Sequence, residues 1–359
     1  MKRIILITVI LLLLLAILSG CAVDNVPAGT PEPPPPPLQQ SSPEPPQPQQ
    51  NPESKAGDPS PAEYEGEKIS VIATFFAPFD FARTIAGQRA DVTMLLPPGS
   101  ESHSFEPSPQ DIINIMNSDV FIYVGGDSDE WVGRILDSMD TSEMTIVSLM
   151  ESASLLVSEV VEGMQDHDDG GHGHHHHDEE EDDDEFDEHV WTSPRNSMMI
   201  VEAICDALCL AALENSEYFR QNTSVFLEEL TNLDSAFRAV VDSAARRTLV
   251  FGDRFPFRYF AAEYGLDYFA AFPGCSTETE PSVQTVAFLI GKVRSEQIPV
   301  VFHIELSNER MADTISEETG AVKMLLHSAH NISRTDFQNG VTYLDVMARN
   351  VEALRAALW

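Results

Sequence analysis

The sequence predicts an α/β protein of two similar lobes, each a mainly parallel sheet with flanking helices, joined by one long rigid helix. Three observations predict this fold. Short β-rich apolar runs alternate with helical patterns after residue 67, one long helical pattern then interrupts them, and a second alternation of the same kind follows. Two such lobes usually hold a ligand in the cleft between them, beyond the carboxyl ends of their strands.

The first residues are typical of an export signal. Lys2 and Arg3 precede an apolar stretch over residues 4–18, which is short for a membrane span. The Leu-Ser-Gly directly before Cys21 is typical of the lipobox of bacterial lipoproteins, in which the cysteine is acylated. We expect a signal peptide at 1–20 and a lipid anchor at Cys21, with an uncleaved signal anchor as the alternative. Both interpretations place the body outside the cytoplasm, held at a membrane.

A proline-rich tether is expected over residues 21–67. It is dominated by Pro, Gln, Ser and Glu, which cannot bury a core and favour an extended, semi-rigid chain. The remaining residues, 68–359, are enough for two modest domains. The net charge of −37 argues against nucleic acid as a partner and favours the attraction of cations.

The first lobe is expected over residues 68–216. Apolar runs rich in β-branched and aromatic residues predict strands at 69–75, 92–96, 120–124 and 145–149. Helical patterns follow at 79–87, 109–117, 130–139 and 194–213. This alternation is typical of βαβ units with a parallel sheet covered on both faces.

A connecting helix is expected at 217–246, because apolar residues recur there at helical spacing. The second lobe then occupies 247–359. Its predicted strands are 248–251, 268–272, 300–303 and 323–326, and its predicted helices are 257–264, 282–295, 309–319 and 346–358.

A segment rich in histidine and acidic residues, 164–188, interrupts the first lobe. Its histidines are His167, His172, His174, His175, His176 and His177. An acidic run follows, and a seventh histidine, His189, comes directly after it. Imidazole and carboxylate are the side chains that transition metals prefer where thiolates are scarce, so we expect an auxiliary loop that binds metal weakly. A solvated loop without a ligand is the alternative, because the tract has too little apolar surface to fold.

Three cysteines remain besides Cys21. Cys205 and Cys209 lie one helical turn apart among apolar residues, which favours buried packing thiols over a disulfide or a metal site. Cys275 has no evident partner, and we leave it out of the site.

Several motifs carry a resemblance to a known family. They are VTMLLPPGSESHSFEPSPQD at 92–111, SDVFIYVGG at 118–126, DEHVWTSPRN at 187–196, RYFAAEYGL at 258–266 and ETEPSVQTVAFLIGKVRSEQIPVVF at 278–302. Over essentially all of 68–359 the chain resembles the substrate-binding lipoproteins of zinc and manganese ABC importers. The resemblance implies a metal held between the two lobes, with the importer's permease and its ATPase as partners.

The resemblance also implies metal ligands. His103 and His189 match the family's first and second ligand histidines. The third position is a His or Glu ahead of a helix, and FGDRFPFRYF places it on Asp253 if one residue is inserted, or on Arg254 if none is. A guanidinium stays protonated and cannot coordinate a cation, so Asp253 is the expected ligand, with a helix-capping Asp as the alternative.

The fourth ligand of the family follows the last strand of the second lobe, where LLHSAHN offers His327. His330 could replace it if the loop turns differently, and Glu305 could orient a ligand imidazole. His303 is expected to be structural. Asp187 and Glu188 flank His189 and could tune it, but solvated charge is the plainer interpretation of both.

The expected ligands, three imidazoles and one carboxylate, suit tetrahedral Zn(II), whereas Mn(II) favours more oxygen ligands and is the lesser alternative. The leading hypothesis is a monomeric extracytoplasmic lipoprotein that captures Zn(II) and delivers it to an ABC importer. A surface adhesin or metal-buffering protein is the first alternative. A zinc-dependent hydrolase is disfavoured, because the sequence has no HExxH and no clear general base paired with a nucleophile.

Overall fold

The computed structural model describes residues 64–101, 105–126, 129–164, 185–274, 276 and 281–359, which belong to one compact unit. Several predicted features lie outside the described residues: the export signal, Cys21, nearly all of the tether, His103, Cys275, and the six histidines of the tract. None of the helices in the described ranges is long and apolar enough to cross a membrane.

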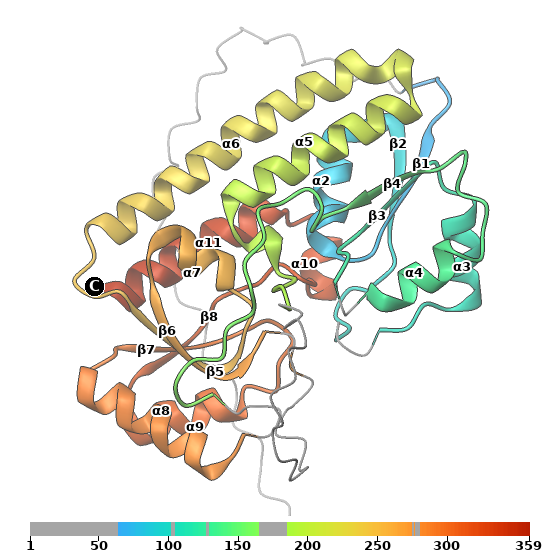
Figure 1. Ribbon diagram of the computed structural model, residues 1–359. Helices are drawn as coiled ribbons and strands as arrows, with labels where there is room; N and C mark the ends of the chain where they lie inside the picture. The colour runs from blue at the N-terminus through green and yellow to red at the C-terminus, as the bar shows by residue number, and fades with distance from the viewer. Residues whose placement is uncertain (1–63, 102–104, 127–128, 165–184, 275, 277–280) are drawn as a thin grey trace, which may run out of the picture. The chain divides into compact units, whose positions relative to one another are not determined.

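The first lobe contains a four-stranded parallel sheet with the order β2-β1-β3-β4 (Figure 1). The strands are β1 (Ile69–Ala73), β2 (Ala90–Met94), β3 (Val120–Tyr123) and β4 (Thr145–Ser148). Its helices are α2 (Phe76–Ala86), α3 (Pro109–Met116), α4 (Glu130–Leu136) and α5 (Pro194–Ala211), with short 3-10 turns η1 (Gly87–Arg89) and η3 (Val190–Thr192). Local chemistry sets the helix starts: Ser108 and Asp111 form a capping box at α3, and the Ser193 hydroxyl accepts from the Asn196 N–H at α5.

The second lobe repeats the arrangement with the order β6-β5-β7-β8, again all parallel. The strands are β5 (Thr248–Phe255), β6 (Asp267–Pro273), β7 (Val300–His303) and β8 (Val322–Leu325). The helices are α7 (Arg258–Tyr264), α8 (Val283–Glu296), α9 (Arg310–Thr319), α10 (Arg334–Gln338) and α11 (Tyr343–Leu358).

One long helix, α6 (Ser216–Asp242), follows the 3-10 turn η4 (Leu213–Asn215) and packs against elements of both lobes. It contacts α2 and α5 of the first lobe and α7 and α11 of the second (Figure 1). Its buried face consists of apolar residues at helical spacing, among them Phe226, Leu230, Leu233 and Phe237. These residues belong to a hydrophobic core cluster that includes residues of both lobes, and each lobe also has a smaller cluster of its own.

The two sheets share one topology, and this positions the site. In each sheet the chain moves from its first strand to a neighbour on one side, then crosses to the other side for its third strand. Connections therefore diverge at the carboxyl ends of β1 and β3, and again at those of β5 and β7. Open parallel sheets bind ligands at such switch points.

The predicted elements agree with this fold, although several of their ends differ by a few residues. β5 continues to Phe255, with a register shift between Phe251 and Arg254. The short helix α10 was not predicted. Asp253 lies within β5, while the residue preceding α7 is Phe257, so the helix-capping alternative for Asp253 is wrong. The prediction of buried, unpaired thiols at Cys205 and Cys209 is confirmed.

Candidate metal centre

A cavity of about 230 Å³ opens at the carboxyl ends of β5 and β7. The first lobe contributes Ser100, Glu101 and His189 to its lining. The second lobe contributes, with others, Asp253, Arg254, Glu305 and His330. The cavity therefore lies between the lobes, at the place where the topology predicts a ligand.

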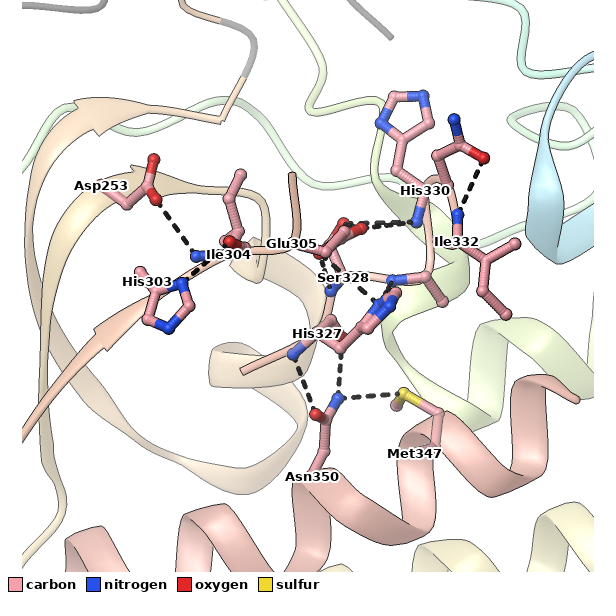
Figure 2. Close-up of polar contacts among 12 residues, drawn as sticks. Asp253, His303, Ile304, Glu305, His327, Ser328, His330, Ile332, Met347 and Asn350 are labelled. Atoms are coloured by element: carbon pink, nitrogen blue, oxygen red, sulfur yellow. Dashed lines mark hydrogen bonds and ion pairs between the residues drawn. The ribbon is translucent and has the colours of Figure 1, made fainter. Parts of the chain in front are cut away.

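The His330 side chain lines this cavity. The conformation of the loop that carries His330, next to Ser328 and Glu305, sets the position of the imidazole (Figure 2). The preceding residue, Ala329, has a φ of 59°, a left-handed conformation that costs free energy outside glycine. The Glu305 carboxylate offsets this cost, because it accepts hydrogen bonds from the N–H groups of Ser328 (2.8 Å) and His330 (3.1 Å) and from the Ser328 hydroxyl (2.6 Å). Glu305 is thus the support of the loop that carries His330.

Aromatic rings from the first lobe surround the His330 imidazole. Its ring centroid lies 4.8 Å from that of Phe75, 5.1 Å from that of Trp191 and 5.8 Å from that of His189. The Trp191 indole N–H donates to the Ser328 carbonyl at 2.8 Å, which ties the two lobes together beside the imidazoles. His189 and His330 therefore meet edge to face across the lobe boundary.

His189 is fixed by Asp187. The Asp187 Oδ1 atom lies 2.9 Å from the His189 backbone nitrogen and 3.2 Å from its Nδ1. An ionised carboxylate can only accept, so Nδ1 carries the proton and Nε2 carries the lone pair that a metal needs. Asp187 is 5% exposed and Glu188 4%, so the interpretation of both as solvated charge is wrong.

A glycine makes room for the His189 ring. A Cβ added at Gly274 would come within 3.0 Å of both the His189 Cε1 atom and the Phe255 carbonyl oxygen. Only a residue without a side chain lets the end of β6 approach the imidazole so closely.

His327 has a different environment. It is 7% exposed and is not among the described residues that line the cavity. Its Nδ1 accepts from the Ala329 N–H at 3.0 Å, and Asn350 bonds both its backbone N–H and its carbonyl (Figure 2). In this structure His327 stabilises the turn that presents His330.

Asp253 lines the cavity from the irregular end of β5. Its two carboxylate oxygens accept from the N–H groups of Arg254 (2.9 Å) and Ile304 (3.1 Å). Burial raises the pKa of the Asp253 carboxyl above its ordinary value. The two hydrogen bonds lower the pKa, but the effect of burial is larger. Gly252 permits the arrangement, because a Cβ there would lie 2.6 Å from the backbone of Ala312 in α9.

His303 is separate from the cavity. Its Nδ1 lies 3.1 Å from the Ile304 carbonyl and 3.9 Å from a Glu309 carboxylate oxygen. It is absent from the described lining, which is consistent with a structural role.

Arg254 forms an ion pair between the two lobes. Its Nη1 lies 3.1 Å from a carboxylate oxygen of Glu101, which belongs to the loop after β2. The described lining of the cavity therefore has three carboxylates, Glu101, Asp253 and Glu305, and one guanidinium. When the imidazoles are neutral and the three carboxylates are ionised, these side chains carry a net negative charge. Such a lining favours the binding of a divalent cation.

A buried acid lies behind the imidazoles. Asp129 lines a smaller cavity together with Phe75, Trp131 and His330. Burial raises its pKa to about 6, and the negative charge of Glu188 acts in the same direction, whereas the Val124 N–H, bound at 2.6 Å, lowers it. The first lobe therefore places a buried acid with a raised pKa beside His330.

Comparison with known proteins identifies the family. A family model described as ZnuA, zinc-uptake complex component A, periplasmic, matches residues 71–357. The chain belongs to this family. It is 32% identical over 289 residues, 80% of this chain and 55% of the relative, to the zinc-binding lipoprotein AdcA of Streptococcus pneumoniae (strain ATCC BAA-255 / R6).

A second relative matches over nearly its whole length. This chain is 30% identical over 297 residues, 83% of this chain and 90% of the relative, to the high-affinity zinc uptake system protein ZnuA of Bacillus subtilis (strain 168). The Zn(II)-bound ZnuA-like domain of S. pneumoniae AdcA has a TM-score of 0.65 and 28% identity, and the match covers 81% of this chain and 99% of that domain. The chain spans about half the length of the AdcA relatives it matches.

Within this ZnuA-family chain, no group of three His, Cys, Asp or Glu side chains in the described ranges is close enough to hold a metal. The described part supplies two facing imidazoles and a carboxylate on the cavity wall, while His103 lies outside it. Sequence reasoning raised a role for Asp187 beside His189 but preferred solvated charge, and it missed the engagement of His327 in the turn. The Asp-x-His spacing in DEHVW was the available signal for Asp187.

Proposed function

We propose that this protein captures Zn(II) outside the cytoplasm and delivers it to the permease of an ABC importer. The observation that carries the proposal is the pair His189 and His330, two imidazoles from opposite lobes whose ring centroids are 5.8 Å apart in the cleft of a ZnuA-family fold. Imidazole is a preferred zinc ligand. Membership in a family of zinc-uptake components also argues against the hydrolase hypothesis.

The proposed ligands are His103, His189 and His330, with Asp253 as the carboxylate on the same cavity wall. His330 is chosen over His327 because it lines the cavity, whereas His327 accepts a backbone N–H and lies apart from the described lining. Three imidazoles with one carboxylate favour tetrahedral Zn(II) over Mn(II). The bound cation would also favour the ionised form of Asp253 despite its burial.

The histidine tract is proposed as a weak collector of zinc that acts beside the tight site. Its flanking residues support this placement: the Ser158 N–H donates to the Glu185 carbonyl at 2.8 Å, and Val157 pairs with Phe186 in an antiparallel bridge. Asp187, which orients His189, follows directly. Side chains lose conformational entropy when they bind a metal, so each such site would be weak, and the tract is close to His189 in the sequence.

The proposal also includes the anchor. Cleavage after residue 20 and acylation of Cys21 would hold the body at the membrane surface through the tether 21–67, within reach of the permease and its ATPase. The AdcA relative is named a lipoprotein, which supports this assignment. Mass spectrometry of the protein purified from membranes tests it: an acylated Cys21 at the N-terminus is expected, and an intact N-terminus would contradict it.

Zinc affinity of histidine variants tests the ligand set. The mature chain is stripped with a chelator, and zinc is then titrated in competition with a chromogenic chelator. We expect His189→Ala and His330→Ala each to weaken tight binding at least about 100-fold, or about 2.7 kcal/mol. His327→Ala should cost less than about tenfold, and His303→Ala is the matched control that should leave the affinity unchanged.

Two outcomes would overturn these assignments. If the double variant His189→Ala, His330→Ala kept tight zinc binding, the cleft would not be the zinc site. If His327→Ala abolished binding while His330→Ala did not, the fourth ligand would be His327.

A further inference from the structure

The loop after β2 lies on the second-lobe segment that carries His330. The Gly99 N–H donates to the Ile332 carbonyl at 2.8 Å, and the Arg334 Nε donates to the Pro98 carbonyl at 3.2 Å. These bonds join residues more than 230 positions apart, since the Arg334–Pro98 separation is 236. The same loop leads directly to His103.

Asn331 makes the central contact of this junction. Its Nδ2 donates to the Pro97 carbonyl at 3.0 Å and to the Ser100 carbonyl at 2.7 Å. Its Oδ1 accepts from the Ile332 N–H at 2.8 Å. Because the Asn331 Oδ1 atom already accepts a hydrogen bond, the NH₂ group must be the end of the amide that faces the two carbonyls. Each of its two N–H bonds then donates to one carbonyl.

The burial of Asn331 increases the free energy that would be lost if these hydrogen bonds were broken. Asn331 is 2% exposed, so its side-chain amide is removed from water and depends on these two carbonyls for its hydrogen bonds, although Pro97 itself is exposed and Ser100 is half-buried. The Glu101–Arg254 ion pair joins the same loop to the second lobe, but Glu101 is 42% exposed and such pairs contribute little. Among the described contacts of this loop, the buried amide is therefore the strongest constraint.

We infer that Asn331 is a positioning residue of the metal centre, which holds the loop 97–101 of the first lobe against the segment bearing His330. This inference rests on the proposed function. Asn331 directly follows His330, and Ser100 is three residues from His103, at most about 10 Å along an extended chain. Asn331 thereby joins a first-lobe loop, whose Ser100 and Glu101 line the cavity, to the segment that carries His330 before the metal arrives, and this reduces the ordering cost of binding.

Asn331→Asp is the sharpest perturbation. It keeps the size of the side chain and the acceptor for Ile332, but it replaces the NH₂ group with an oxygen that faces two carbonyl oxygens. Asn331→Ala is the second variant, because it removes the amide without adding repulsion. Asn222→Asp is the matched control: the Asn222 Nδ2 also donates to a distant carbonyl, that of Ile85 at 2.8 Å, between α6 and α2 and away from the cleft.

The assay is zinc affinity and zinc release of the full mature chain, measured by chelator competition and stopped flow. We expect Asn331→Asp and Asn331→Ala to weaken zinc at least tenfold, mainly through faster release, while Asn222→Asp stays within twofold. The visible spectrum of bound Co(II) should shift in the Asn331 variants and not in the control, since a purely structural role would lower the melting temperature without changing the metal's coordination.

Hydrogen exchange of the parent protein gives a readout that does not depend on the folding of a variant. The Gly99 amide should be protected in the metal-free parent, because the junction precedes metal binding. Fast exchange of Gly99, or an affinity within twofold of the parent in folded Asn331→Ala, would overturn the inference. Failure of the parent to bind zinc tightly would instead refute the proposed function, so the two failures are distinguishable.

Discussion

Replacing Asp187 tests whether the carboxylate behind His189 tunes the metal centre. Its Oδ1 accepts two bonds, from the His189 backbone N–H (2.9 Å) and from Nδ1 (3.2 Å), in a site that is 5% exposed. Asp187→Asn keeps an acceptor but removes the charge, and charge-assisted bonds are roughly twice as strong as neutral ones. Loss of a partner that orients a metal-binding imidazole costs about 10- to 100-fold in affinity.

We therefore expect Asp187→Asn to weaken zinc about tenfold, or about 1.4 kcal/mol, and Asp187→Ala about 100-fold. Competition with a chromogenic chelator at fixed pH measures both. Asp267→Asn, at an exposed position at the start of β6, is the control and should bind zinc like the parent. Parent-like affinity in Asp187→Ala, with the fold intact by circular dichroism, would refute the reasoning.

Three further predictions follow from the described contacts. Burial raises the pKa of Asp129 to about 6 from an ordinary 3.8. Between these two pH values the native state therefore binds more protons than the unfolded state, so the free energy of unfolding of the parent falls as the pH rises from 3.8 to 6. Relative to the parent, Asp129→Asn should gain about 2 kcal/mol of unfolding free energy between pH 4 and pH 7, measured by urea denaturation; a difference independent of pH would contradict this. Trp191→Phe removes the indole donor to the Ser328 carbonyl and should lower the unfolding free energy of the metal-free protein by about 2 kcal/mol, whereas an unchanged urea midpoint would show that this bond is unimportant. Replacing residues 165–184 with a short Gly-Ser linker, which spares Asp187, should remove the weak zinc sites seen by calorimetry while tight affinity stays within about tenfold; a larger loss would place a tight ligand in the tract.

The strands and helices were predictable because their signals are local. Apolar runs separated by helical patterns predicted both sheets and most of the helices. The end of β5 was not predictable, because its extension through Gly252 and Asp253 depends on the close approach of α9 and on the Ile304 N–H.

The histidine pair near the C-terminus shows the same limit within the site. His327 and His330 are three residues apart, and the sequence offers both to a metal. Their difference in the structure depends on the left-handed φ of Ala329, which Glu305 stabilises from another loop. No local pattern specifies a conformation that distant hydrogen bonds maintain.

By itself the sequence determined the two parallel α/β lobes around a long helix and the resemblance to metal-binding proteins of that fold, and it predicted His189 as a metal ligand. Periodicity and short motifs carry this information because they depend on neighbours in the chain. Only the tertiary structure decided that His330 faces His189, that Asp187 is buried as the partner of His189, and that Asn331 joins the loop before His103 to the opposite lobe. These contacts join residues far apart in the sequence or depend on burial, and both arise only when the two lobes pack against each other.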